Sequence, residues 1–246
     1  MGELCAGAIG TVALHPAAAG DGRQMVPAGA VADIVLVAAG DALVLARAGD
    51  DRVQSFPRVH GSSPVAAWDL RRRTGDTVLV EEGGEDIRRG ARDEWKILTA
   101  ASLMGLARRA LEIGAEYATG RRAFGTPIGS FQGVAHPLAD AATEIDGGTL
   151  LVRRAAWLVD QAAHEEAAHL ARLAWGFCGP VATATTARCV HIHGGYGAAL
   201  EYDIQLFHQR ARAWSSMFGD PREELRAVGN CLLAAAGEEA GGWTSS

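Results

Sequence analysis

The chain has 246 residues, which is enough for one large or two small domains with a hydrophobic core, and its formal net charge is −6. The acidic balance argues against a general nucleic-acid binder, because neutralising phosphates needs a basic surface. No run of about 18 apolar residues occurs, so no membrane span is predicted. The N-terminus carries no export signal, which makes the cytoplasm the expected location. Four cysteines without CxxC spacing predict neither a zinc site nor a disulfide framework: Cys5, Cys178, Cys189 and Cys231.

The first 90 residues are rich in glycine and in short apolar runs, which predict strands. Residues 34–38 and 42–46 flank Ala39-Gly40-Asp41, which is a hairpin signal. The acidic, glycine-containing stretch 81–86 is typical of a linker. Further strand candidates lie at 11–14, 53–56 and 77–80. The sequence therefore predicts a partial β domain over residues 1–90, as a small antiparallel sheet or partial barrel.

The rest of the chain, residues 91–246, has the 3.6-residue apolar period of helices. Between Glu94 and Gly120, two adjacent apolar stripes predict a helix that is buried over a wide arc. Pro180 is expected to kink or interrupt the third helix. The predicted helices cover 94–120, 134–159, 165–193, 204–218 and 221–235. Their lengths and short connections predict an antiparallel helical bundle, so the fold class is α+β and mainly α.

Histidines and glutamates near residue 164 superficially resemble metal-binding motifs. His164 and His169 are five residues apart, so they diverge on a helix and do not form a zinc-protease pair. Glu166 and His169 have the spacing of di-iron bundles, but the second pair and the two further carboxylates that such a site needs are missing. A solvated helix start is favoured and no metal site is predicted, with an iron-containing bundle as a distant alternative.

The connection between the first two bundle helices combines an arginine, an aromatic residue and glycines. Arg121 follows the predicted helix end at Gly120, and Phe124-Gly125 comes three residues later. A guanidinium beside an aromatic ring forms a suitable edge for a pyrophosphate and a planar ring. The alternative is an ordinary interhelical loop with an exposed arginine, and these residues by themselves leave both interpretations open.

Two motifs in this half of the chain resemble the C-terminal domain of the acyl-CoA dehydrogenase family. Arg121-x-x-Phe124-Gly125, followed by Pro127-Ile128 and Phe131-Gln132, is similar to the family's R-x-x-F-G-x-P-I and F-Q pattern. The segment from His191 to Gly197, HIHGGYG, matches in part the second signature, Q-x-x-G-G-x-G. The two motifs follow the family's order, 70 residues apart, each at a predicted helix boundary.

The resemblance implies an FAD-dependent enzyme that forms a trans double bond between the α and β carbons of an acyl-CoA. In this family the C-terminal domain reaches a flavin that a neighbouring subunit binds. The resemblance therefore also implies a homo- or heterotetramer with the cofactor across an interface.

The same resemblance implies a role for each matching residue. Arg121 would pair with the FAD pyrophosphate, and Phe124 would pack against the dinucleotide. Gln132 would offer its amide to the adenosine part, and Gly194-Gly195 would let the backbone come close to the cofactor. His191 stands in place of the family's glutamine, where an imidazole can still donate one hydrogen bond.

The family's chemistry needs a carboxylate base in a dry pocket, with its pKa raised towards the working pH. Most members have a Glu where this chain has Gly219, and a minority have the base where this chain has Trp95. Glu94, one residue from the second position, is the remaining candidate, although one residue rotates a helical side chain by about 100 degrees. Its alternative role is an acidic residue in the first helical turn. Asp220, before Pro221, is expected to be an N-cap.

The segment from Leu206 to Pro221 resembles one actinobacterial subgroup, whose members work as pairs of unlike subunits on CoA thioesters of steroid side chains. In such a pair, one subunit can lack the base while its partner supplies it. The leading hypothesis is a dehydrogenase subunit that binds FAD jointly with a homologous partner and acts on an acyl-CoA substrate. A non-catalytic scaffold or regulatory subunit is one alternative, and a gene fragment or misplaced start codon is another.

Overall fold

A computed structural model describes residues 6–15, 23–48, 63–70 and 77–241. The chain divides into two compact units, Met1–Trp95 and Lys96–Ser246, and helix α2, Gly84–Gly120, runs from the first unit into the second. The predicted strand at 53–56 lies outside the described residues. Within the described ranges, no helix combines the length and the apolar character needed to cross a membrane.

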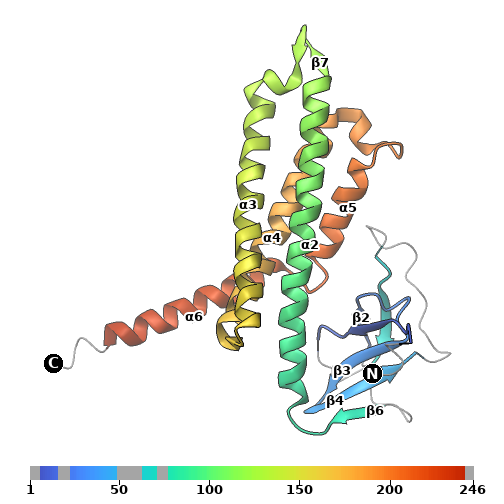
Figure 1. Cartoon of the computed structure of the whole chain (residues 1–246), viewed down its shortest axis with the longest axis vertical. Coiled ribbons are helices and arrows are strands. Elements are labelled where there is room, and N and C mark those ends of the chain that lie inside the picture. Colours follow the sequence, from blue (N-terminus) through green and yellow to red (C-terminus); the bar gives the residue numbers. More distant parts are fainter. Residues whose placement is uncertain (1–5, 16–22, 49–62, 71–76, 242–246) are drawn as a thin grey trace. The chain divides into compact units, whose positions relative to one another are not determined.

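The described strands of the first unit form two small sheets (Figure 1). The larger sheet has the strand order β1-β3-β4-β6, and the smaller one pairs β2 with β5. All pairs are antiparallel except β1 with β3. The strands are β1 Gly10–Val12, β2 Arg23–Val26, β3 Ile34–Ala39, β4 Ala42–Arg47, β5 Ala66–Asp69 and β6 Thr77–Val80. The expected small sheet is confirmed, with a parallel strand at one edge that the sequence pattern does not predict.

The predicted hairpin is confirmed at β3 and β4. Ala39 pairs with Ala42, so Gly40 and Asp41 form a two-residue turn. Gly40 has a φ of 64°, which glycine adopts without steric cost. The two strands bury one face in a cluster that includes Val35, Val37, Val44 and Trp68.

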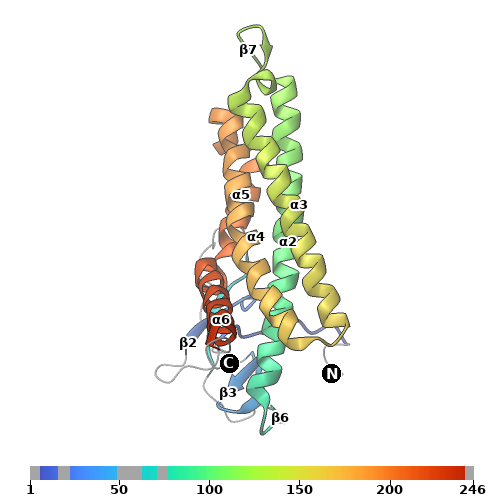
Figure 2. The ribbon, with the colours of Figure 1, turned by 90° about the vertical axis from the view of Figure 1, so that its left-hand side faces the viewer.

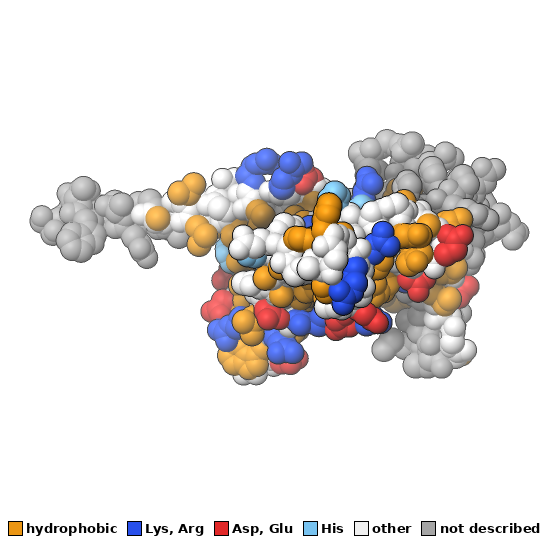
Figure 3. All heavy atoms as spheres, turned by 90° about the horizontal axis from the view of Figure 1, so that it is seen from above, with side chains coloured by type: hydrophobic (Ala, Val, Ile, Leu, Met, Phe, Trp, Pro, Cys, Tyr) orange, Lys and Arg blue, Asp and Glu red, His pale blue; other side chains and the backbone are white. Residues whose placement is uncertain are grey.

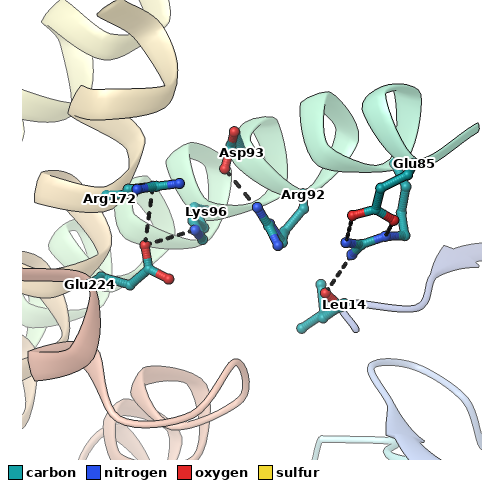
Figure 4. A network of polar contacts seen from close by, with 8 residues as sticks. Leu14, Glu85, Arg92, Asp93, Lys96, Arg172 and Glu224 are labelled. Atoms are coloured by element: carbon teal, nitrogen blue, oxygen red, sulfur yellow. Dashed lines mark hydrogen bonds and ion pairs between the residues drawn. The ribbon is translucent and has the colours of Figure 1, made fainter. Parts of the chain in front are cut away.

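Helix α2 begins at Gly84, so the predicted start at Glu94 and the predicted linker over 81–86 are wrong. The side chain of Arg88 explains the earlier start. It is only 1% exposed, bonds both carboxylate oxygens of Glu85, and donates to the Leu14 carbonyl at 2.8 Å (Figure 4). The hydrogen bonds that Arg88 donates to Glu85 also lower the pKa of the Glu85 carboxyl. A contact between segments far apart in sequence thus stabilises the first turns of the helix.

The second unit is an antiparallel bundle in which α4 packs against α3, α5 and α6 (Figures 1 and 2). Its core contains Leu103 and Met104 of α2, Ile145 of α3 and Cys178 of α4. The helices are α3 Gln132–Asp160, α4 His164–His193, α5 Ile204–Ser215 and α6 Pro221–Gly241. The predicted bundle is therefore confirmed, with helix ends that differ by a few residues.

Helix α4 continues through Pro180 without a break, so the predicted interruption is wrong. The proline removes one backbone hydrogen bond and crowds the preceding turn. The turn before it is held by packing, because Gly176 is buried against Leu225 of α6 and Gly179 against Ser215 of α5. The packing of α4 against α5 and α6 therefore outweighs the tendency of Pro180 to interrupt the helix.

An ion pair joins the start of α6 to the bundle. Lys96, the only lysine of the chain, is fully buried. Its Nζ lies 3.0 Å from Glu224 Oε2 and 4.6 Å from the centroid of the Phe218 ring. Arg172 approaches the same carboxylate at 3.8 Å (Figure 4). A buried ammonium needs such a partner, because an uncompensated charge in the interior is very unfavourable.

Replacing Glu224 with alanine is therefore expected to destabilise the bundle strongly. The substitution removes the carboxylate that faces Lys96, and breaking a buried pair from one side costs about 3 kcal/mol. Urea unfolding followed by circular dichroism measures the loss. The matched control is Glu223→Ala, since the side chain of Glu223 is 71% exposed and pairs with Arg226 on the surface, an arrangement worth about 0.5 kcal/mol. Equal losses for the two variants would contradict the structural role of the Lys96 pair.

Candidate functional site

The connection between α2 and α3 is a small β-hairpin, where the sequence predicts only a loop. Strand β7, Arg122–Ala123, pairs antiparallel with β8, Thr126–Pro127. Phe124 and Gly125 form the two-residue turn, with φ of 52° and 82°. Two positive φ values in succession are typical of a type I′ turn. The hairpin lies at the end of the bundle where α2 finishes and α3 starts (Figure 1).

Phe124 combines backbone strain with full exposure. A non-glycine residue in the left-handed region costs on the order of 1 kcal/mol, and the Phe124 side chain is 96% exposed. Its ring approaches Phe131 edge-on, with ring centroids 6.3 Å apart. Phe131 is itself 39% exposed. An exposed aromatic pair held by a strained turn is typical of a surface that binds another molecule.

Arg121 is positioned by backbone hydrogen bonds on both sides. Its N–H donates to the Tyr117 carbonyl at 2.8 Å, and its own carbonyl accepts from the Ile128 N–H at 2.8 Å. The guanidinium is exposed and forms no ion pair with any described residue. Gln132, the first residue of α3, is exposed as well. Both side chains are therefore available to a ligand.

The second motif forms a tight turn after α4. Gly194 ends the helix with φ 60° and ψ −136°, a conformation that strongly favours glycine. The turn continues as the short 3-10 helix η3, Gly194–Ala198. A Cβ on Gly197 would overlap the Val190 carbonyl, whereas a Cβ on Gly195 would meet nothing within 4 Å. Gly197 is thus needed for the fold, and Gly195 leaves an open backbone surface.

The structure brings the two motifs to the same end of the bundle. Tyr117 lies one helical turn before Arg121, and His193 directly precedes Gly194. Their rings stack with centroids 4.1 Å apart. Seen from this end, hydrophobic and basic side chains gather side by side on the surface (Figure 3). The sequence pattern gives no signal for the contact between Tyr117 and His193, which joins residues 76 positions apart.

The Arg121 hairpin and the Gly194 turn offer donors and an aromatic surface, but the candidate bases do not form a dry pocket. Glu94 is exposed, and it lies outside the first turn of α2, where the acidic residues are Glu85 and Asp86. The helix-dipole role predicted for Glu94 is therefore wrong. Gly219 is exposed with a φ of 112°.

Asp220 caps α6, as predicted. Its Oδ1 accepts a hydrogen bond from the backbone N–H of Arg222 at 3.0 Å, and its carboxylate pairs with the Arg222 guanidinium at 2.7 Å. Hydrogen bonds from Arg222 lower the pKa of Asp220. A base for proton abstraction from carbon needs the opposite shift, so Asp220 serves as a cap.

Other polar groups of the bundle suggest no second reactive centre. Burial raises the pKa of Cys178 to about 12 and that of Cys189 to about 11, so both thiols stay protonated at neutral pH. Among the described residues, no group of three or more His, Cys, Asp or Glu side chains could hold a metal ion. His191, on the last turn of α4, is exposed beside the Gly194 turn.

Comparisons with known proteins agree on one family. The model of the acyl-CoA dehydrogenase C-terminal domain matches residues 90–228. Acyl-CoA dehydrogenase IpdE2 of Mycolicibacterium smegmatis is 32% identical over 229 residues, which are 92% of this chain and 65% of that protein. The chain thus spans slightly less than two thirds of the length of this curated relative.

Solved structures share the fold. The crystal structure of the ChsE4–ChsE5 complex from Mycobacterium tuberculosis matches with a TM-score of 0.76 and 27% identity, covering 92% of this chain and 66% of that chain. The structure described as the Tcur3481-Tcur3483 steroid ACAD has a TM-score of 0.75 at 24% identity, covering 93% of this chain and 68% of that chain.

The family model covers more than half of the sequence, from the early part of α2 into α6. Both signature motifs lie at the same end of the bundle. The chain belongs to the acyl-CoA dehydrogenase family.

Proposed function

We propose that this chain is one subunit of an FAD-dependent acyl-CoA dehydrogenase and that it contributes one edge of a flavin site shared with a homologous partner. The observation that carries the proposal is the convergence of the exposed Arg121–Phe124 hairpin and the Gly194-Gly195 turn at one bundle end. The reaction is the α,β-desaturation of an acyl-CoA thioester.

The residues at this edge fit a dinucleotide. The exposed Arg121 guanidinium forms no ion pair with any described residue, and it can bind a pyrophosphate in a bidentate manner. The exposed Phe124 ring offers a flat apolar surface, and Gln132 offers an amide. Gly194-Gly195 carries no side chain that would hold the cofactor away, and His191 can donate one hydrogen bond. Bound FAD would accept the hydride, while these residues bind and orient it.

A partner subunit is supported by what this chain exposes and by what it lacks. Large apolar side chains are exposed at Phe124, Leu150, Leu200 and Leu233, from 65% to 96%, and contacts between proteins cover such surfaces. The family's usual base position holds Gly219. We therefore assign the base that removes the α proton to the partner. A purely structural subunit is the second candidate, because a chain without a carboxylate at position 219 could also be non-catalytic.

Replacing Arg121 with alanine separates these two functions. In the complex with the homologous subunit, we expect FAD affinity to fall about 10- to 100-fold, because a charge-assisted contact to the pyrophosphate is lost. Titration of the flavin-free complex with FAD measures the effect. Arg109→Ala is the control, since Arg109 is exposed and pairs with Glu112 on α2. Unchanged FAD affinity in Arg121→Ala would favour the structural subunit. Full flavin occupancy and activity of the chain alone would contradict the shared site.

Two alanine substitutions in the η3 turn should behave differently. Gly197→Ala forces the Val190 carbonyl to move and is expected to destabilise the chain by about 2 kcal/mol, as overpacking does. Gly195→Ala meets open space, so it should leave thermal unfolding unchanged while weakening FAD binding in the complex. Gly197→Ala thus tests the contribution of the turn to stability, and Gly195→Ala tests its contribution to FAD affinity. If Gly195→Ala binds FAD as the parent does, the turn does not approach the cofactor.

Glu94→Gln tests whether this chain supplies the base. Glu94 is exposed, and a proton-abstracting carboxylate needs a dry environment. We expect acyl-CoA oxidation by the complex to stay within about twofold of the parent, with Glu112→Gln, another exposed glutamate of α2, as the control. A selective loss of about 100-fold or more, the usual contribution of a general base, would assign the base to Glu94.

A further inference from the structure

The rings of Tyr117 and His193 form a stacked contact between α2 and the last residue of α4. The two rings lie nearly parallel, with an interplanar angle of 25° and centroids 4.1 Å apart. The Tyr117 hydroxyl also reaches the His193 carbonyl at 3.5 Å. His193 is only 4% exposed, so the contact is shielded from water on the histidine side.

The orientation of the His193 ring is set by its own helix. Nδ1 lies 2.7 Å from the Cys189 carbonyl, which can only accept a hydrogen bond, so Nδ1 carries the proton. His193 is the last residue of α4, and a side-chain donor at this position satisfies a carbonyl of the last turn. The ring of Tyr202 also approaches His193 edge-on, with centroids 6.3 Å apart. The histidine therefore presents a fixed surface to Tyr117.

Tyr117 is joined directly to the Arg121 hairpin, and His193 is joined directly to the Gly194-Gly195 turn. The Tyr117 carbonyl accepts the N–H of Arg121 at 2.8 Å, so a shift of Tyr117 moves the start of the hairpin. His193 is bonded covalently to Gly194, so a shift of His193 moves the turn. This stack is therefore a side-chain contact that couples the position of the hairpin to the position of the Gly194 turn.

We propose that Tyr117 and His193 are positioning residues that set the spacing between Arg121 and the Gly194-Gly195 turn for one dinucleotide. This inference rests on the proposed function, in which both motifs contact the same FAD. A ligand that contacts two elements at once binds best when their spacing is fixed beforehand, because less conformational freedom is lost on binding. Neither residue touches the cofactor in this proposal.

The test uses the complex with the homologous subunit, stripped of flavin and titrated with FAD. Tyr117→Phe keeps the ring and should bind FAD within about twofold of the parent, whereas Tyr117→Leu removes the stack and should weaken binding about tenfold. His193→Asn keeps a donor for the Cys189 carbonyl but removes the stacked ring, and should weaken binding similarly. It supplies the same comparison if Tyr117→Leu does not fold.

Two controls separate positioning from general loss of stability. Leu158→Ala removes a buried side chain near the opposite end of α3, and it should lower the melting temperature while FAD affinity stays within about twofold of the parent. In the Arg121→Ala background, Tyr117→Leu should add less than about twofold, because its effect passes through Arg121.

Each contrary result is distinct. Unchanged FAD affinity in Tyr117→Leu and His193→Asn overturns the inference, and so does a loss that is fully additive with Arg121→Ala. Equal weakening by Leu158→Ala overturns it too, because the effect would then be one of stability. If Arg121→Ala itself leaves FAD affinity unchanged, the proposed function fails.

Discussion

The close approach of α2 and α4 near their C-terminal ends decides where the candidate cofactor residues lie. A Cβ on Gly114 would stand 2.9 Å from Cys189 Sγ, so glycine at this position lets the two helices pack closely. Fully buried Ala110 continues the contact one turn earlier. A larger residue at either position would separate the turns that carry Tyr117 and His193. The hairpin and the Gly194 turn would then lose the spacing that the bundle gives them.

At this end of the bundle, the buried helix ends and the exposed side chains differ in what they contribute. The buried helix ends are held by stacking, hydrogen bonding and close backbone packing. The side chains available to a ligand, above all those of Phe124 and Arg121, are exposed and make few contacts with the described residues. Exposing a ring on a strained turn does not stabilise the isolated chain, because the strain is uncompensated. This arrangement makes physical sense when a second molecule covers the ring, as in the proposed cofactor site.

Local pattern and long-range contact explain what the sequence could and could not predict. The 3.6-residue period predicted the bundle helices, and the Gly40-Asp41 signal predicted the β3–β4 hairpin. The early start of α2 was missed because it depends on Arg88 reaching Leu14, 74 residues away. The hairpin after Arg121 was missed because its strands have two residues each and its turn places a phenylalanine at positive φ. The motif residues were found through the family resemblance, whereas the pair that supports them has no local signature.

The backbone at Gly219 disfavours a carboxylate at the base position that the family resemblance implies. Gly219 has a φ of 112°, so a glutamate there would adopt a conformation that costs on the order of 1–3 kcal/mol. The residues around it cannot easily relax that strain. Phe218 lies against the Lys96 ammonium on one side, and Asp220 is committed to capping α6 on the other. Restoring a carboxylate would therefore require this loop to change its path, which a single substitution does not provide. This constraint on the loop agrees with the proposal that a partner subunit supplies the base.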